Sequence, residues 1–194
     1  TTHPPPGNWI DPIAETFLVD VNIYPEGLFL QKVKLYFRSK DANIPVTMQI
    51  RPTSNGYPHS TFVMPFGSVT KKPANVNIPS AANFDKNDGI LNHATEFEFD
   101  SPVYLQPGEY AIVLIANTNN YEVYTAEIGG TKLGKTDIIS EQPYAGSFFK
   151  SQNSSTWTPE QTTDLMFELV KYKFKAASLN VNVYTEYVDG YAGN

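Results

Sequence analysis

The sequence contains no cysteine among its 194 residues. Disulfide bonds, thiolate metal sites and cysteine nucleophiles are therefore excluded together. The absence does not identify a compartment, because a cysteine-free chain is indifferent to the redox state around it. The fold must be stabilised by packing, hydrogen bonds and charge alone.

Long apolar runs and an excess of basic residues are also missing. No apolar stretch approaches the roughly 18 residues of a membrane-spanning helix, so we expect no membrane insertion. The net charge is −6 and the pI is near 5.0, which argues against nucleic acid as a partner because its recognition needs a basic patch. The chain has no signal-peptide pattern and begins with Thr. We therefore expect processing or, in preference, excision from a longer polypeptide.

Motifs for catalysis are absent as well. The three histidines, His3, His59 and His93, are not paired at metal-ligand spacing. No Gly-x-Ser-x-Gly elbow and no phosphate-cradling glycine loop occurs. We predict that the protein is not an enzyme, that it has no catalytic residues and that it needs no cofactor.

The residues that are present favour a β-rich globular domain. Apolar residues make up 41% of the chain and aromatic residues 13%, which is enough for a substantial core. Apolar and polar residues alternate along short segments between Gly, Pro and Asn turns, a pattern typical of strands. The apolar run 110–116 predicts a central strand buried on both faces. The expected strands are 16–19, 28–38, 45–51, 95–99, 110–116, 122–127, 165–172 and 179–184.

This spacing predicts an all-β fold, namely an antiparallel β-sandwich of jelly-roll type with extended N- and C-terminal arms. Residues 1–12 form a proline-rich arm, since three consecutive prolines favour an extended polyproline conformation. Residues 13–174 form the sandwich, and residues 175–194 form a C-terminal extension or the start of a next element. The apolar strand faces predict the core residues Val33, Leu35, Phe37, Val46, Met48, Ile50, Phe97, Phe99, Ile112, Leu114, Leu165, Phe167 and Leu169.

Acidic residues on one strand face are candidates for cation binding or for acid–base chemistry. Glu96, Glu98 and Asp100 alternate with Phe97 and Phe99. Carboxylates at alternate strand positions lie about 7 Å apart and need only water around them. We therefore expect a solvated face opposite a buried one.

A second acidic segment, 85–89, superficially resembles a calcium loop. The EF-hand pattern requires glycine at its sixth position, but the sixth residue here, counted from Asp85, is Ile90. A turn built from Asx residues is favoured. We predict no metal, with Asp85, Asn87 and Asp88 as weak candidate ligands.

Aromatic residues are the remaining candidates for function. For Phe148, Phe149 and Trp157 burial is favoured, and the segment 134–158 is predicted to be an ordered loop that they anchor to the sandwich. A short helix is considered from Pro159 onward, with Thr158 as its N-cap. The interface or glycan candidates are Tyr57, Tyr121, Tyr144, Phe148, Phe149 and Trp157.

Four blocks carry a family resemblance: 11–17 (DPIAETF), 45–58 (PVTMQIRPTSNGYP), 97–129 (with SPVYLQPGEYAIVLIANTNNYEVYTAEIG) and 139–174 (with SEQPYAGSFFKSQNSSTW and DLMFELVKYKF). They resemble a domain repeated in virion structural proteins of large contractile-tailed bacteriophages, in the tail, baseplate or fibre. The resemblance implies a non-enzymatic module located in the virion. Its implied partners are other virion proteins, including copies of itself. It passes on no active-site residues.

Two other interpretations stay open. A carbohydrate-binding module that recognises a host surface glycan would stack aromatic rings on sugar faces. In that case Tyr57→Ala or Tyr121→Ala would abolish glycan binding by the isolated domain. The third interpretation is an accessory domain of a secreted glycan-active enzyme.

Overall fold

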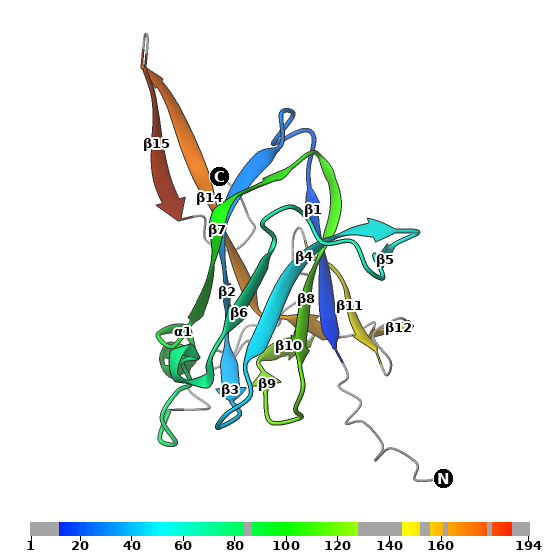
Figure 1. Cartoon of the computed structure of the whole chain (residues 1–194), viewed down its shortest axis with the longest axis vertical. Coiled ribbons are helices and arrows are strands. Elements are labelled where there is room, and N and C mark those ends of the chain that lie inside the picture. The colour runs from blue at the N-terminus through cyan, green and yellow to red at the C-terminus, as the bar shows by residue number, and fades with distance from the viewer. Residues whose placement is uncertain are drawn as a thin grey trace, which may run out of the picture.

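The computed structural model of the chain describes residues 12–83, 87–127, 145–151, 156–160, 163–177 and 180–187. Within these ranges the protein is built from antiparallel sheets (Figure 1), so the all-β prediction is confirmed. The helical elements in the same ranges are the short helix α1 (Asn87–Leu91) and one 3-10 turn, η1 (Pro73–Asn75). The expected arm 1–12 lies outside the described residues, apart from Pro12.

The larger sheet surrounds a doubly buried strand. Its members are β1 (Ile13–Val19), β4 (Val46–Ser54), β5 (Tyr57–Pro58), β6 (Ser68–Lys71), β8 (Gly108–Ala116), β11 (Ala145–Ser151) and β12 (Trp157–Glu160). The order is β12-β11-β1-β8-β4, and both β5 and β6 pair with β4. On β8, Ile112 and Leu114 belong to the main core, whereas Ala111 and Val113 pack in a second cluster on the opposite face. The predicted central strand is therefore confirmed.

The second sheet has the order β15-β14-β2-β7. Its members are β2 (Leu28–Leu35), β7 (Thr95–Leu105), β14 (Phe167–Ala177) and β15 (Asn180–Tyr187). Two small ladders join β3 (Phe37–Ser39) to β9 (Glu122–Val123) and β10 (Thr125–Glu127) to β13 (Thr163–Leu165). The expected strands 28–38 and 122–127 are thus each divided in two, because the chain changes its pairing partner within them.

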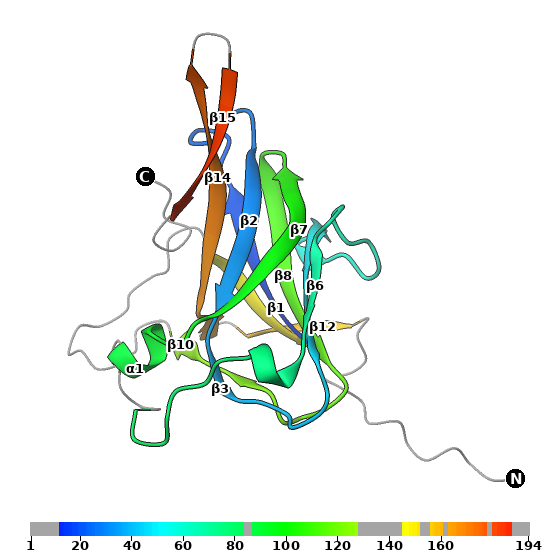
Figure 2. The ribbon, with the colours of Figure 1, turned by 60° about the vertical axis from the view of Figure 1, so that its left-hand side comes forward.

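The two sheets lie face to face in the ribbon (Figure 2). The main core combines buried side chains from both. Met48 and Ile50 enter it from β4, while Val33 and Phe97 enter it from β2 and β7, and all four are fully buried. The predicted core residues are buried with one exception, Phe167, which is partly buried and packs against the same cluster. The alternation therefore gave the strand register correctly.

The expected helix after Thr158 is wrong. Trp157–Glu160 is the strand β12, and Thr163–Leu165 is the strand β13. Pro159 suits the first turn of a helix, but it is equally tolerated in β12, which is the edge of its sheet. The expected loop 134–158 likewise contains the strand β11. Its residues 134–144 and 152–155 lie outside the described part of the chain.

A long hairpin continues past the expected sandwich boundary. Strand β14 runs through residue 174 to Ala177, and β15 pairs with it from Val170 to Ala177. Strand β14 pairs with β2 only as far as Lys171. Both views show the β14–β15 hairpin reaching beyond the rest of the body (Figures 1 and 2).

Candidate functional site

Three of the predicted aromatic residues are buried on the two faces of β11 and β12. Phe148 enters the main core between the sheets. Phe149 and Trp157 cover the other face of the larger sheet, where Ala14 and Ala111 leave room for their rings. The exposed fractions are 3% for Phe149 and 7% for Trp157, so the prediction of burial is confirmed. Both rings are closed to a ligand, and they hold β11 and β12 to the sheet.

Tyr57 and Tyr121, the tyrosines named for glycan binding, differ in exposure. Tyr57 is 45% exposed, and its ring rests against Phe149 with the centroids 5.5 Å apart. Tyr121 packs against the main core. Its ring meets the ring of Phe37 edge-on at 5.9 Å, and its hydroxyl donates to the backbone carbonyl of Ile44. Tyr144 lies outside the described residues.

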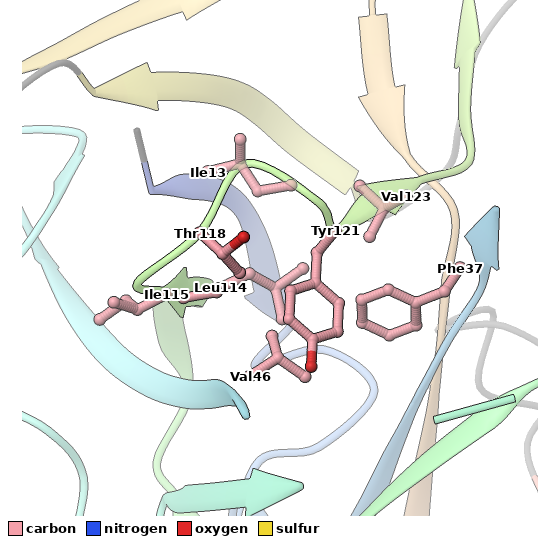
Figure 3. A pocket seen from close by; sticks show the side chains of 9 residues that line it. Ile13, Phe37, Val46, Leu114, Ile115, Thr118, Tyr121 and Val123 are labelled. Atoms are coloured by element: carbon pink, nitrogen blue, oxygen red, sulfur yellow. The ribbon is translucent and has the colours of Figure 1, made fainter. Parts of the chain in front are cut away.

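A small hollow adjoins Tyr121 (Figure 3). Apolar side chains from β1, β3, β4, β8 and β9 line it together with Thr118 and Tyr121. Its volume is about 80 Å³, well below the roughly 300–1,000 Å³ of typical ligand pockets. We infer that Tyr121 closes this end of the core and is not placed to stack on a sugar.

The loop that carries Tyr121 is fastened by a buried carboxylate. Asp41 Oδ1 accepts hydrogen bonds from the backbone N–H groups of Asn43 (2.7 Å) and Ile44 (2.8 Å). Its Oδ2 accepts from Thr118 Oγ1 (2.8 Å) and Asn120 Nδ2 (2.7 Å). The backbone donors, followed by the two side chains, hold the pKa of Asp41 well below its usual range. Its two oxygens accept from four donors, so this carboxylate holds the loop 41–44 to the loop 118–120.

A pair of buried carboxyl groups is the most unusual chemistry in the described residues. Glu15 on β1 is fully buried, and Asp164 on β13 is 4% exposed. The residues opposite Glu15 on the neighbouring strands are Ile112 and Phe148, both in the main core. Sequence reasoning missed this pair. The available signal was the position of Glu15 two residues from both Ile13 and Phe17, which places it on an apolar strand face.

The environment of this pair keeps Glu15 neutral. Burial, and then the charge of Asp164, raises the pKa of Glu15 to about 10. Burial also raises the pKa of Asp164. Neither oxygen of Glu15 has a hydrogen-bond partner of standard geometry among the described residues. Asp164 therefore acts on Glu15 through its charge more than through a well-formed hydrogen bond. Two neighbouring carboxyl groups with raised pKa values are suited to acid–base chemistry, but burial leaves no surface on which a substrate can meet them.

The acidic face of β7 is solvated, as predicted. Glu96, Glu98 and Asp100 are exposed, and Phe97 and Phe99 between them are buried. Glu96 also forms an ion pair with Lys32, whose Nζ lies 3.0 Å from Glu96 Oε2.

Two of the three weak metal candidates fall within the described backbone. Asn87 and Asp88 lie in the helix α1, so the turn expected over 85–89 is helical in part. Asp85 lies outside the described residues. Within the described ranges, no group of three or more acidic or histidine side chains is arranged to hold a metal ion. The described helices are also too short and too polar to cross a membrane.

Comparison of the chain with protein-family models, with curated proteins and with solved structures finds no match. The resemblance to bacteriophage virion proteins therefore stays a prediction.

Proposed function

We propose that the protein is a non-enzymatic structural module of a bacteriophage virion, in the tail, baseplate or fibre, and that it contacts neighbouring virion subunits. The observation that carries this proposal is the β14–β15 hairpin. Residues 172–177 of β14 pair with β15 alone among the described strands. A two-stranded hairpin is marginally stable in water unless a third strand or another surface supports it.

The register of the hairpin also favours a partner. Along the ribbon, mainly apolar cross-strand pairs alternate with polar ones, a pattern typical of a ribbon with one face against a surface. Strand β15 is moreover the edge of its sheet, and an edge strand is a template for pairing with another chain. The mainly apolar pairs are Tyr172 with Thr185, Phe174 with Val183, and Ala176 with Val181, and the polar ones are Lys171 with Glu186, Lys173 with Tyr184, and Lys175 with Asn182.

The jelly-roll sandwich belongs to the same proposal. Strand β1 pairs with β8 in the larger sheet, while β2 pairs with β7 in the second sheet. On the opposite side, β11 pairs with β1 and β14 pairs with β2. Such paired winding of strands across two layers supports a jelly roll formed by residues 13–174. The N-terminal arm and the C-terminal hairpin would then extend from it toward neighbours.

Glycan binding has less support. Of the two tyrosines named for it, Tyr121 is tied into the core by Ile44 and Phe37. Tyr57 keeps an exposed ring, but stacking on one ring alone gives a sugar little to bind. Host recognition by this domain is therefore the alternative outcome of the test.

The test is to shorten the hairpin without disturbing the body. Lys173 and Tyr184 face each other in register, so replacing residues 174–183 by Asn-Gly joins them through a two-residue turn. We expect this variant to keep the urea midpoint of the full chain and to lose incorporation into phage particles. The readout is the amount of the protein in purified particles.

The matched control is Glu98→Ala, which alters a solvated strand face and should leave incorporation unchanged. Normal incorporation of the shortened variant would contradict the proposal. Glycan-array binding by the full chain that Tyr57→Ala abolishes would favour the carbohydrate-binding alternative.

A further inference from the structure

A second hollow, the Phe66 groove, lies at the end of the molecule where β7 turns into β8. The loop residues Met64, Pro65 and Phe66 line it together with Pro102, Tyr104 and Tyr110. Its volume is about 330 Å³, within the roughly 300–1,000 Å³ range of ligand pockets. Phe66 is 62% exposed and Tyr104 41% exposed, so the groove presents aromatic faces to solvent.

The two tyrosine rings of this groove are held in place. The Tyr104 hydroxyl donates to the backbone carbonyl of Glu26 (2.8 Å), and its ring lies 4.8 Å from that of Phe29. The Tyr110 hydroxyl donates to the backbone carbonyl of Gln106 (2.9 Å). Rings fixed in this way lose little conformational freedom when a ligand binds, which favours affinity.

Phe66 itself occupies a strained backbone position. The N–H of Gly67 donates to the carbonyl of Met64 (2.8 Å), so Pro65 and Phe66 are the central residues of a turn. Phe66 has φ 63°, a region that glycine favours and that a bulky residue rarely adopts. The loop is latched to β4 on both sides, because Met64 N–H donates to Ile50 O and Ile50 N–H donates to Gly67 O. A large, mostly exposed ring kept at a strained position points to a contact outside the monomer.

We propose that the Phe66 groove binds the polyproline segment Pro4-Pro5-Pro6 of a second copy of this chain. This inference rests on the proposed assembly function and names one of its partners. Grooves lined by aromatic residues recognise proline-rich segments, because a polyproline helix is preformed and presents its rings along a ridge. Gln106 lines the same groove, and its side-chain amide can donate to the unpaired carbonyls of such a helix.

The geometry favours a second copy over the chain's own arm. The arm joins the body at Pro12, before β1, whereas Val19 at the other end of β1 pairs with Gly108 beside the groove. The start of β1 and the turn between β7 and β8 lie at opposite ends of the body (Figures 1 and 2). Seven strand residues span roughly 23 Å. The three prolines lie only about 19–25 Å of polyproline chain from Pro12, which leaves no length for the reversal that an own-chain contact needs. Contact between copies is then head-to-tail and can propagate.

The experiment measures self-association of the full chain by sedimentation velocity over a range of concentrations. The arm variant carries Pro4→Ser, Pro5→Ser and Pro6→Ser. The groove variant is Phe66→Gly, which removes the ring and suits the positive φ. We expect each variant alone to associate at least about tenfold more weakly than the unaltered chain. A mixture of the two should form a one-to-one dimer that does not grow, since one copy supplies an arm and the other a groove.

Phe62→Gly is the control, because Phe62 is 52% exposed on the same loop and does not line the groove. Its association should be unchanged. The urea midpoint of Phe66→Gly should not fall, which separates lost binding from lost folding.

A mixture that stays monomeric, or association that neither variant weakens, would overturn the proposal. If the unaltered chain is monomeric but still enters particles, this contact is wrong and the assembly function stands. If the chain associates through its arm but never enters particles, the contact stands and the assembly function is wrong.

Discussion

Glu15 shows at the scale of one residue how this core tolerates an acid. Its carboxyl lies among apolar neighbours, with Asp164 beside it and no well-formed hydrogen bond among the described residues. An ionised carboxylate there would carry a large desolvation penalty. The folded state avoids this penalty by keeping the proton, so stability becomes linked to pH.

The sign of that linkage can be tested with Glu15→Gln. The pKa of Glu15 is raised to about 10 in the folded chain, against about 4.3 when unfolded. Between these values the folded state holds a proton that the unfolded state has released, so the free energy of unfolding falls as pH rises. The slope for one full proton is about 1.4 kcal/mol per pH unit. Glutamine is neutral throughout, so Glu15→Gln should unfold at higher urea than the unaltered chain at pH 8, and at a similar concentration at pH 4.

The control for that titration is Glu98→Gln on the solvated face of β7, which should reproduce the slope of the unaltered chain. If Glu15→Gln keeps the full slope as well, the neutral state of Glu15 is wrong. Part of the slope is expected to survive in Glu15→Gln, because burial raises the pKa of Asp164 in the same direction.

Phe97 tests the strand register. It is fully buried, it lies opposite Val33 on β2, and its ring centroid is 6.1 Å from that of Phe37. Phe97→Ala removes a large side chain from a closely packed core, so we expect a loss of about 3–5 kcal/mol in the free energy of unfolding, measured with urea. Glu98→Ala, one residue further on, should change it by less than about 0.5 kcal/mol. Similar losses at both positions would contradict the register.

At the scale of elements, the β14–β15 hairpin makes a prediction that needs no mutation. Strand β2 is bonded on both sides by β7 and β14, whereas β15 is bonded by β14 alone among the described strands. Local opening therefore costs less in β15 than in β2. Hydrogen exchange of the isolated chain should show the amides of residues 181–187 exchanging much faster than those of residues 30–35. In assembled particles the amides of β15 should become protected, and equal protection in both states would argue against an assembly role.

How far the sequence predicts these elements depends on whether local pattern or distant pairing decides them. Strict alternation located β4 and β7, and the turn at Asn55-Gly56 followed from residues that adopt positive φ (54° and 81°). Strands β11 and β12 were not predicted, because polar residues mask their alternation and their pairing depends on β1, far away in the sequence. The division of 28–38 into β2 and β3 was missed for a similar reason. A change of pairing partner leaves no local signal.

The candidate sites differ in the same way: some follow from local sequence, and others depend on contacts between distant segments. Burial of Phe148, Phe149 and Trp157 followed from the size and apolarity of their rings. The Glu15–Asp164 pair requires β1 and β13 to meet, and the Phe66 groove requires the loop 59–67 to fold beside the end of β7. Sequence spacing does not report either contact. Those sites became visible only from the tertiary structure.

At the scale of the whole molecule, the two sheets share one main core. Each sheet supplies fully buried side chains to it, Phe17 and Met48 from the larger and Leu30 and Leu105 from the second. The chain also crosses repeatedly between the sheets, so neither sheet is a continuous segment that could fold alone. We therefore expect the body to unfold as one cooperative unit.

This cooperativity can be measured by following each part of the core with its own signal. In a Trp9→Phe background, the fluorescence of Trp157 reports the second cluster on the outer face of the larger sheet, while far-UV circular dichroism reports both sheets. The two urea transitions should coincide in midpoint and in slope, since loss of either sheet exposes the core of the other. The variant with residues 174–183 replaced should keep the same midpoint, because those residues lie beyond the last pairing of β14 with β2.

A Trp157 transition at clearly lower urea would mean that β11 and β12 detach first, and that the second cluster is a separate, weaker unit. A lowered midpoint in the shortened variant would instead place the outer hairpin inside the cooperative body, and the domain would then extend beyond residue 174.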